Sequence, residues 1–440
     1  MSDVIAAIAT ASGEGAVAIV KISGSGADKV ASQLFFRENF EFSAAEPNKL
    51  YLGTVRAGRV EDKAFAVIFR APKSYTGEDV VELQLHGGRV VAEAVLEAAV
   101  SFGARPAEPG EFTKRAYLNG KMSLSEAEGV EAIILADSEA EAVAAYRALG
   151  GELDRTIRLA GDILVEAAAM TDVALDYPEE MADEEKPQIL GSLNEVKGIL
   201  NSLIGTERDR KLVTDGISVV LSGLVNAGKS SLMNAICGAE RAIVTEYAGT
   251  TRDVLRERLE INGIKVTLSD TAGIREGAEG AEKIGIARAE EAYKGADLVL
   301  FVMDGTEPEG EEEIALYRKI SVKPNIRVLN KSDESKYPRE ADIIVSAVTG
   351  ENLSALREMI AEKAGLKKGI NPPLIRERGL HAAITALKAV EEAITALGRE
   401  TPDCVAVDIK EALERLYSIT GEDAKESVVE EIFARFCVGK

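Results

Sequence analysis

The chain has 440 residues, 46% of them hydrophobic and 29% charged, which is the balance of a globular protein with two to four domains. Its formal net charge of −22 excludes a broadly basic surface for nonspecific duplex binding, although a local basic pocket could still hold a structured RNA. There is no apolar run of roughly 18 residues, no secretory signal and no cysteine spacing typical of a zinc site or a disulfide framework, so we expect a cytoplasmic protein with no membrane span.

Residues 1–118 alternate short apolar runs with turn signals, which predicts a small mixed α/β domain. Within this stretch Val81, Leu83 and Leu85 are expected on one face of a strand, with the polar residues between them on the other face. A helix is expected next, over residues 90–104.

Residues 119–212 are rich in alanine, leucine and glutamate, and their apolar residues recur three and four positions apart, which predicts long amphipathic helices. The same pattern returns in residues 373–440, over 381–398, 405–421 and 427–436. Residues 213–372, between the two stretches, have a different pattern. We therefore predict a helical domain in two parts, 119–212 and 373–440, with another domain inserted into it.

The inserted stretch, residues 213–372, contains β-rich apolar runs that end in polar or glycine residues and alternate with helical segments. These runs span residues 216–224, 265–273, 297–304, 326–333 and 341–347. This order predicts an α/β domain with a mostly parallel sheet and crossover helices. The fold class expected for the whole chain is multi-domain, with α+β and α/β parts.

A phosphate-binding motif follows the first of these runs. Residues 223–230 read GLVNAGKS, which fits G-x-x-x-x-G-K-[ST] between a strand and a helix. The glycines allow main-chain N–H groups to face a phosphate, while Lys229 would reach the β- and γ-phosphates and Ser230 would ligate Mg²⁺. The residues of this motif assigned to the nucleotide are Asn226, Ala227, Gly228, Lys229, Ser230 and Ser231.

Three further motifs follow in order, each at the end of an apolar run. The first, DTAG, can hold the Mg²⁺ shell with its carboxylate and contact the γ-phosphate with the amide of Gly273. The second, NKSD, can select guanine, because Asp333 would accept two hydrogens that adenine does not offer. The third, Ser346-Ala347, would place main-chain N–H groups beside the guanine oxygen. The residues assigned to the nucleotide here are Asp270, Thr271, Ala272, Gly273, Asn330, Lys331, Ser332, Asp333, Ser346 and Ala347. Together these motifs predict a GTP-hydrolysing enzyme.

Activation of water is less clear from the motifs, because Ile274 follows DTAG where related enzymes have a glutamine. Glu282 is a candidate, with a solvated charge on a switch helix as the alternative. In the segment GTTRD (249–253), Thr251 can close on Mg²⁺ when the γ-phosphate is present. Arg252 and Arg275 are either charge-stabilising groups or surface residues.

The chain closely resembles the MnmE (TrmE) family of tRNA-modifying GTPases, within the TrmE-Era-EngA-like P-loop GTPases, over essentially its whole length. The GTPase motifs indicate only the superfamily. More specific are SYTGEDVVELQLHGG (74–88), EPGEFTKRAYLNGKMSLSEAE (108–128) and the C-terminal FCVGK (436–440), which resemble family signatures in both flanking domains.

The resemblance implies a potassium-stimulated GTP hydrolase that takes part in tRNA modification. With an FAD-dependent partner, MnmG (GidA), in a heterotetramer, such an enzyme installs an aminomethyl or carboxymethylaminomethyl group at C5 of the wobble uridine of tRNA. The N-terminal domain is then expected to bind a one-carbon donor, 5-formyl- or 5,10-methylene-tetrahydrofolate, and to form a homodimer.

The resemblance also implies residue roles in the G domain. Glu282 aligns with the water-positioning glutamate, and Lys229 and Gly273 are the other catalytic residues. Mg²⁺ would be held by Ser230 and Thr251. The K⁺ ligands would be Asn226, Thr245, Tyr247 and Thr250, and the nucleotide-contacting segment comprises Thr245, Glu246, Tyr247, Ala248, Gly249, Thr250 and Thr251.

For folate, the resemblance places Lys21, Glu78, Lys121 and Lys440 around the ligand, with Cys437 nearby as a catalytic or a structural thiol. The other cysteines, Cys237 and Cys404, are expected in core packing. Two departures concern contacts: Val225 stands where the family usually has proline, and Lys21 replaces an arginine, so that a bidentate contact becomes a point charge.

Two other functions remain alternatives. A GTP-dependent ribosome-assembly switch shares the central motifs, but it should carry an RNA-binding module such as a KH domain and should not end in FCVGK. A stand-alone folate-dependent methyltransferase would have no need of the NKSD motif.

Overall fold

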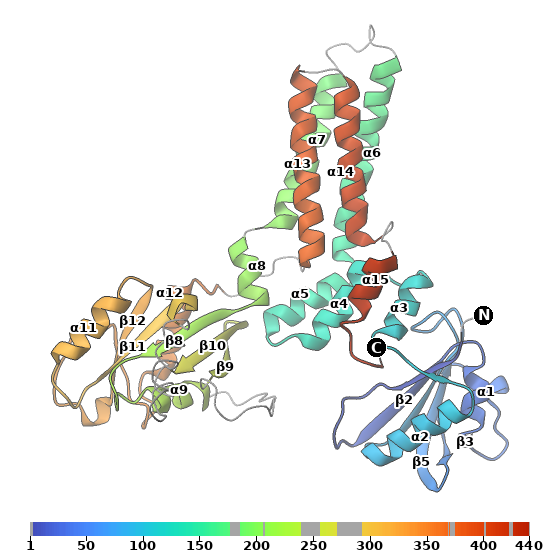
Figure 1. Ribbon diagram of the computed structural model, residues 1–440, viewed down its shortest axis with the longest axis horizontal. Coiled ribbons are helices and arrows are strands. Elements are labelled where there is room, and N and C mark those ends of the chain that lie inside the picture. Colours follow the sequence, from blue (N-terminus) through green and yellow to red (C-terminus); the bar gives the residue numbers. More distant parts are fainter. Residues whose placement is uncertain are drawn as a thin grey trace, which may run out of the picture. The chain divides into compact units, whose positions relative to one another are not determined.

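The computed structural model describes residues 3–176, 185–205, 207–238, 256–270, 293–367, 369, 375–399, 402–421 and 426–439 (Figure 1). The chain divides into two compact units. The first comprises Met1–Ile134, Tyr146–Ile204 and Ile375–Lys440, and the second comprises Leu135–Ala145 and Gly205–Leu374. The four-part division at residues 118, 212 and 372 stays a prediction. No helix among the described residues is both long and apolar enough to cross a bilayer.

The first unit begins with a mixed sheet in the order β3-β4-β5-β6-β2-β1-β7. Neighbouring strands are antiparallel, except that β1 and β7 are parallel. The strands are β1 Ile5–Ile8, β2 Val17–Ser23, β3 Phe35–Phe36, β4 Tyr51–Ala57, β5 Val60–Phe69, β6 Val80–His86 and β7 Arg105–Pro106. The accompanying helices are α1 Ala27–Ser32, η1 Phe42–Ala44, α2 Arg89–Ser101 and α3 Glu111–Leu118.

The predicted alternation in β6 is confirmed. Val81, Leu83 and Leu85 are buried, whereas Glu82 and Gln84, which point to the other face, are half-buried. The buried set packs with α1, α2 and the other strands in one hydrophobic core. The fold class predicted for this part of the chain is therefore confirmed.

The rest of the first unit is helical, as the apolar spacing predicts. Helices α6, α7, α13 and α14 pack side by side as a bundle around a core of leucine, isoleucine, valine and alanine side chains (Figure 1). The helices are α4 Leu124–Leu135, α5 Glu139–Leu149, α6 Glu152–Asp176, α7 Glu185–Ile204, α13 Glu377–Arg399, α14 Pro402–Thr420 and α15 Glu426–Phe433.

The second unit contains a six-stranded sheet in the order β13-β12-β11-β8-β10-β9, parallel except for the edge strand β9. The strands are β8 Ile217–Ser222, β9 Arg256–Ile261, β10 Ile264–Asp270, β11 Leu298–Asp304, β12 Asn325–Asn330 and β13 Ile343–Ile344. The helical elements are α8 Glu207–Thr214, α9 Lys229–Gly238, α11 Glu311–Ile320, η3 Ser332–Glu334 and α12 Leu353–Ala364. The predicted runs are confirmed as β8, β10, β11, β12 and β13, and β11 is buried along almost its whole length, as parallel strands between helical layers are.

Strand β9 was not among the predicted runs. It pairs with β10 through a two-residue turn, Asn262-Gly263, whose φ angles of 55° and 83° lie in the left-handed region. Asn-Gly is the most favourable dipeptide for such a hairpin turn. The sequence of β9, RERLEI, lacks the continuous apolar run of the other strands, because only one face of β9 contributes to the core.

The N-terminal half of α5 belongs to the second unit. Ala140 and Ala144 are buried in the core of that unit. The Ala140 N–H donates to the Gly263 carbonyl at 3.0 Å, and Arg258 on β9 pairs with Asp137 at 3.1 Å. The chain therefore passes from one unit to the other within a continuous helix.

Candidate functional site

The phosphate-binding loop connects β8 to α9 in a shape that requires glycine at two positions. Gly223 has φ 153°, and a Cβ there would lie 2.1 Å from the Val302 carbonyl oxygen. Gly228 has φ 84°, and a Cβ there would lie 2.3 Å from Nδ2 of Asn330. Both glycines let the loop approach neighbouring strands closely, and the ten-residue helix α9 begins directly after it, with its amide end at the loop.

Lys229 and Ser230 occupy the first turn of α9. The Lys229 side chain is buried, and its Nζ donates to the carbonyls of Gly223 at 3.0 Å and Leu224 at 2.7 Å, so the ammonium lies over the loop. The Ser230 hydroxyl donates to Oδ2 of Asp270 at 2.5 Å, at the end of β10. Oxygen atoms of this kind suit Mg²⁺, and the Asp270 carboxylate is fully buried beside the hydroxyl.

Asn330, at the end of β12, links the phosphate-binding loop to the segment that follows β13, at Ala347. Its side chain is 1% exposed, and Nδ2 donates to the Ala227 carbonyl at 3.1 Å while Oδ1 accepts from the Ala347 N–H at 3.2 Å. Asp333 accepts from the Ser346 hydroxyl at 2.6 Å. The structure thus brings the phosphate-binding loop, Asp270, the NKSD turn and the Ser346-Ala347 pair to the same ends of neighbouring strands, where ligands bind in open α/β sheets.

One participant in this arrangement was missed in the sequence. Asp304, the last residue of β11, accepts from Nζ of Lys331 at 2.6 Å. Burial raises the pKa of Asp304, but the hydrogen bonds from Lys331 and Thr306 outweigh it and bring the pKa below its ordinary value. Lys331 itself has φ 64°, so this ion pair helps to hold a left-handed turn. The available signal was that Asp304 is a polar residue at the end of a predicted strand.

Several predicted site residues lie outside the described residues. They are Thr245, Glu246, Tyr247, Ala248, Gly249, Thr250, Thr251, Arg252, Thr271, Ala272, Gly273, Arg275, Glu282 and Lys440. Of the expected K⁺ ligands, Asn226 is described, with φ 68° at the tip of the loop. Within the described part of the chain no three His, Cys, Asp or Glu side chains group as a metal site. The predicted Mg²⁺ ligand Ser230 is described and contacts Asp270.

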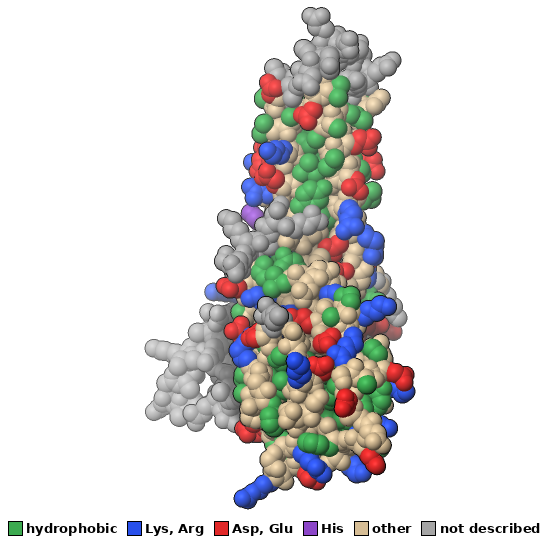
Figure 2. Space-filling model, turned by 90° about the vertical axis from the view of Figure 1, so that its right-hand side faces the viewer, with side chains coloured by type: hydrophobic (Ala, Val, Ile, Leu, Met, Phe, Trp, Pro, Cys, Tyr) green, Lys and Arg blue, Asp and Glu red, His purple; other side chains and the backbone are tan. Residues whose placement is uncertain are grey.

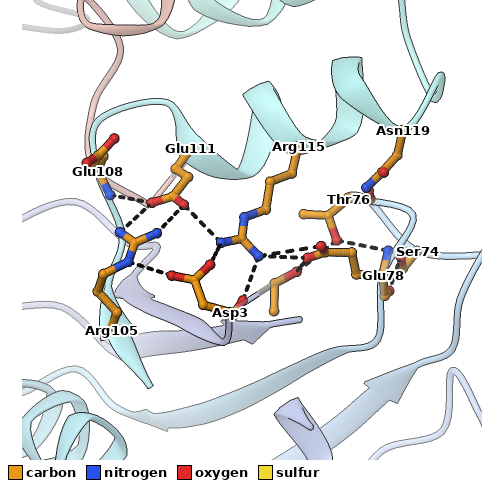
Figure 3. Close-up of polar contacts among 10 residues, drawn as sticks. Asp3, Ser74, Thr76, Glu78, Arg105, Glu108, Glu111, Arg115 and Asn119 are labelled. Atoms are coloured by element: carbon orange, nitrogen blue, oxygen red, sulfur yellow. Dashed lines mark hydrogen bonds and ion pairs between the residues drawn. The ribbon is translucent and has the colours of Figure 1, made fainter. Parts of the chain in front are cut away.

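A second polar site lies in the first unit, around α3 (Figure 3). Arg115 donates to Glu78 at 3.1 Å, to Glu111 at 2.9 Å and to Asp3 at 2.7 Å. Arg105 joins the same group through Glu111 and Asp3, each at 2.7 Å. Burial raises the pKa of the Glu111 carboxyl, but the hydrogen bonds from Arg105, the Glu108 amide and Arg115 hold it below its usual value.

The predicted folate residues Lys21, Glu78 and Lys121 gather around the loop 72–78. Nζ of Lys21 lies 5.3 Å from the centre of the Tyr75 ring, and Lys121 donates to the Pro72 carbonyl at 3.0 Å. Ser23, two residues after Lys21 on β2, donates to Glu78 at 3.0 Å. An aromatic ring, two cations and a carboxylate therefore meet on one loop, and this is a combination that could hold a flat, polar ring with acidic substituents.

The C-terminal segment 436–439 packs against the same part of the first unit. Val438 forms a bridge with Pro109, and the Gly110 N–H donates to the Cys437 carbonyl at 3.4 Å. A Cβ on Gly439 would lie 2.4 Å from the carbonyl oxygen of Ile8, whose strand partner is next to Lys21. The described end of this segment therefore lies against β1, whose partner strand β2 carries Lys21.

The cysteines have different environments. Cys237 is half-buried against the core of the second unit, and burial raises its thiol pKa to about 11. Cys404 is exposed, so the prediction of core packing was wrong for it, because it lies on the outward face of the first turn of α14. Cys437 is exposed.

The face of the molecule shown in Figure 2 carries basic and acidic side chains interspersed, without a segregated basic field.

Two family models match the chain. One, described as the GTP-binding protein TrmE N-terminus, matches residues 4–121, and the other, described as the MnmE helical domain, matches residues 124–437. Among similar proteins, the tRNA modification GTPase MnmE of Syntrophomonas wolfei is 40% identical and covers 100% of both chains. The tRNA modification GTPase MnmE of Aquifex aeolicus is 38% identical, also over 100% of both chains.

Solved structures resemble the chain over a smaller part. Era, solved in complex with MgGDPNP and a segment of 16S ribosomal RNA, is 30% identical and covers 39% of this chain and 66% of its own, with a TM-score of 0.28. The G domain of FeoB from T. maritima is 32% identical and covers 34% of this chain and 98% of its own, with a TM-score of 0.27. Scores this low carry no functional conclusion.

Proposed function

This chain belongs to the MnmE family of tRNA modification GTPases, and we propose that it uses GTP hydrolysis to help install a (carboxymethyl)aminomethyl group at C5 of the wobble uridine. The observation that carries the GTPase part is the convergence of Lys229, Ser230, Asp270 and Asn330 at one end of the sheet. Family membership supports the tRNA part.

In the proposed nucleotide site, each described residue has a defined task. The loop amides and Lys229 bind the phosphates, and Ser230 and Asp270 hold Mg²⁺, directly or through its water shell. Asp333 reads the donor edge of guanine, and its contact with Ser346 supports the orientation needed for this task. Asp333 is exposed in the structure, and a bound base would cover its carboxylate. A covered acceptor without its two donors would be costly, so adenine nucleotides are rejected.

The catalytic additions rest on the family resemblance. We propose that Glu282 positions the attacking water and that Thr251 joins the Mg²⁺ shell. Asn226, Thr245, Tyr247 and Thr250 would bind K⁺, which neutralises negative charge between the β- and γ-phosphates. This assignment makes hydrolysis potassium-stimulated.

The N-terminal site is proposed to bind 5-formyl- or 5,10-methylene-tetrahydrofolate. Lys21 and Lys121, with Lys440, suit the carboxylates of the ligand, and Glu78 suits the donor edge of its pterin ring. The support is that three of these side chains meet at the loop 72–78 and that the C-terminal segment enters the same region. Cys437 has an exposed thiol nearby in that segment.

The proposed partners also follow from the family. We propose a cytoplasmic homodimer that forms a heterotetramer with the FAD-dependent MnmG and acts on tRNA. The expected dimer contact is the N-terminal domain, and the flavin partner would supply the redox chemistry that this chain's own residues do not provide.

The test is mass spectrometry of tRNA nucleosides from cells that lack this chain and are complemented with wild-type protein, Lys229→Ala or Lys319→Ala. Lys319 is an exposed residue of α11 and serves as the matched control. Wild type and Lys319→Ala should restore the C5 modification, whereas Lys229→Ala should not. Unchanged nucleosides in the deletion strain, together with an accumulation of immature ribosomal subunits, would favour the ribosome-assembly alternative.

A further inference from the structure

Arg115 is the centre of the polar network in Figure 3. It belongs to α3, its side chain is 10% exposed, and it contacts the carboxylates of Asp3 and Glu78, which are distant in sequence, and of Glu111, four residues before it on the same helix. It also donates to the main-chain carbonyl of Asp3 at 2.8 Å. A guanidinium with this many partners has a fixed orientation, because its planar donors are all directed.

Glu78 is fixed by this guanidinium and by its own loop. Nη1 of Arg115 lies 3.1 Å from Oε2 and 3.4 Å from Oε1 of Glu78, and the Ser23 hydroxyl donates to Oε2 at 3.0 Å. The main chain of Glu78 is held by Ser74 at its carbonyl and by Thr76 at its amide. A carboxylate offers about four acceptor positions, so these contacts orient Glu78 without exhausting its capacity for a ligand's donors.

The network is not neutral in itself. It combines three carboxylates, from Asp3, Glu78 and Glu111, with two guanidinium groups, from Arg105 and Arg115. Asp3 and Glu111 each contact both arginines, whereas Glu78 contacts only Arg115 among the described contacts of the network. The negative charge that is least shared within the network is therefore at Glu78, toward the loop that also holds Tyr75.

We infer that Arg115 is a positioning residue of the N-terminal site, which orients Glu78 to accept two adjacent N–H groups from a 2-amino-4-oxopteridine ring. This inference rests on the proposed folate function and names a residue that acts through Glu78 without touching the ligand. Without Arg115, Glu78 would have to be ordered by the ligand at the moment of binding. Ordering a mobile side chain and losing one oriented contact together weaken binding by about tenfold.

Arg105 provides a matched control. Both arginines pair with Asp3 and Glu111, but only Arg115 reaches Glu78. A substitution of Arg105 therefore disturbs the same network and tests for a general structural effect. It should lower thermal stability without changing the affinity for folate.

The experiment is calorimetric titration of the full chain with 5-formyl-tetrahydrofolate and with an analogue that lacks the 2-amino group. The variants are Arg115→Gln, Arg115→Lys, Arg105→Gln, Glu78→Gln and the double variant of Glu78 and Arg115. Arg115→Gln and Glu78→Gln should each lose about tenfold in affinity and most of the discrimination against the analogue. The double variant should be no weaker than Glu78→Gln alone, because Arg115 acts through Glu78.

The outcomes separate the inference from the proposed function. If wild type does not bind 5-formyl-tetrahydrofolate, the folate function itself is wrong. If wild type binds and Glu78→Gln weakens binding, but Arg115→Gln keeps full affinity and discrimination, only the positioning role is overturned. Additive losses in the double variant would also overturn it. Should Arg115→Gln fail to fold, Arg115→Lys provides the test, because lysine keeps the charge but lacks the planar pair of donors. If Arg115→Lys discriminated against the analogue as well as wild type does, the positioning role of Arg115 would be refuted.

Discussion

The two proposed binding sites of this molecule are built in different ways. The nucleotide site presents main-chain amides, one lysine and one hydroxyl–carboxylate pair, and its shape depends on Gly223 and Gly228. The N-terminal site instead relies on charged side chains from distant segments, and its central carboxylate is itself oriented by an arginine. The main-chain amides of the first site are positioned by the conformation of one loop. In the second site, each charged side chain of the network contacts one or more oppositely charged partners.

This difference has an expected consequence for substitutions. Each group in the proposed nucleotide site has a single task, so its removal should lower the rate of hydrolysis or the nucleotide specificity by that group's full contribution. In the N-terminal network, Asp3 and Glu111 each have two arginine partners, so the loss of one contact is partly compensated. The comparison would be broken if loss of one of these shared contacts, as in Arg105→Gln, had an effect as large as that of Glu282→Ala in the nucleotide site.

The largest effect is expected for Glu282→Ala. Loss of a group that positions the attacking water should lower kcat for GTP hydrolysis by about 100-fold and leave nucleotide affinity nearly unchanged. Single-turnover hydrolysis together with fluorescence titration of GDP measures both quantities. A large loss of affinity would show that Glu282 is structural.

A smaller but sharp change in specificity is expected for Asp333→Asn. The amide cannot accept both hydrogens from guanine, so the affinity for GDP should fall by roughly 10- to 100-fold. The affinity for xanthosine diphosphate should rise. Competition binding with the two nucleotides measures the shift. Unchanged GDP affinity would refute the role of Asp333 in reading the base.

The next effect concerns potassium. If Asn226 belongs to a K⁺ site, hydrolysis should be about tenfold faster in K⁺ than in Na⁺ at equal ionic strength, because the ion neutralises charge that develops on the phosphates. Asn226→Ala should remove most of the difference. Equal rates of the wild-type protein in both salts would count against the ion site.

In the N-terminal network the expected effect is one of stability with pH. Hydrogen bonds from Arg105 lower the pKa of Asp3, and those from Arg105 and Arg115 outweigh burial at Glu111. Because both folded-state values lie below the unfolded ones, the stabilisation is present above about pH 5 and is lost as pH falls toward 3.

The measurement is the free energy of unfolding of wild type and Arg105→Gln across this range. The difference between them should be roughly 1–2 kcal/mol at pH 6 and should shrink as the carboxyls are protonated. A difference that stayed constant with pH would contradict the ion-pair origin of the stabilisation.

The smallest effect is expected for Lys21→Arg. Nζ of Lys21 lies over the Tyr75 and Phe112 rings, and an arginine there would add a planar fork for a carboxylate. Affinity for 5-formyl-tetrahydrofolate should rise about threefold, as measured by calorimetry. A loss of affinity would show that the space between the two rings fits only the narrower lysine.

The described part of the proposed nucleotide site carries clear sequence signals because its parts are local. Glycine at strained backbone positions, a lysine at a helix start and polar residues at strand ends leave marks at fixed spacing. The ion pair between Asp304 and Lys331 was not predictable, because it joins two strand ends that become neighbours only in the sheet.

The N-terminal network was less predictable from the sequence for the same reason. Asp3 and Arg115 are 112 positions apart, and nothing in either local sequence indicates a partner. The exposure of Cys404 was also mispredicted, since an amphipathic pattern at a helix end does not show which face is covered. In contrast, β9 could have been found from its Asn-Gly turn.

The shared helix α5 has a practical consequence for dissecting the molecule. A fragment cut at residues 213 and 372 would keep all the GTPase motifs but lose Ala140 and Ala144 from its hydrophobic core, and with them the hydrogen bond from Ala140 to Gly263 in the hairpin turn. Such a fragment would expose part of its apolar core and leave the hairpin turn without its partner. Its measured solubility and turnover would then depend on the truncation as well as on the intrinsic properties of the domain. Supplying residues 135–145 as a peptide, or fusing them to the fragment, should restore both.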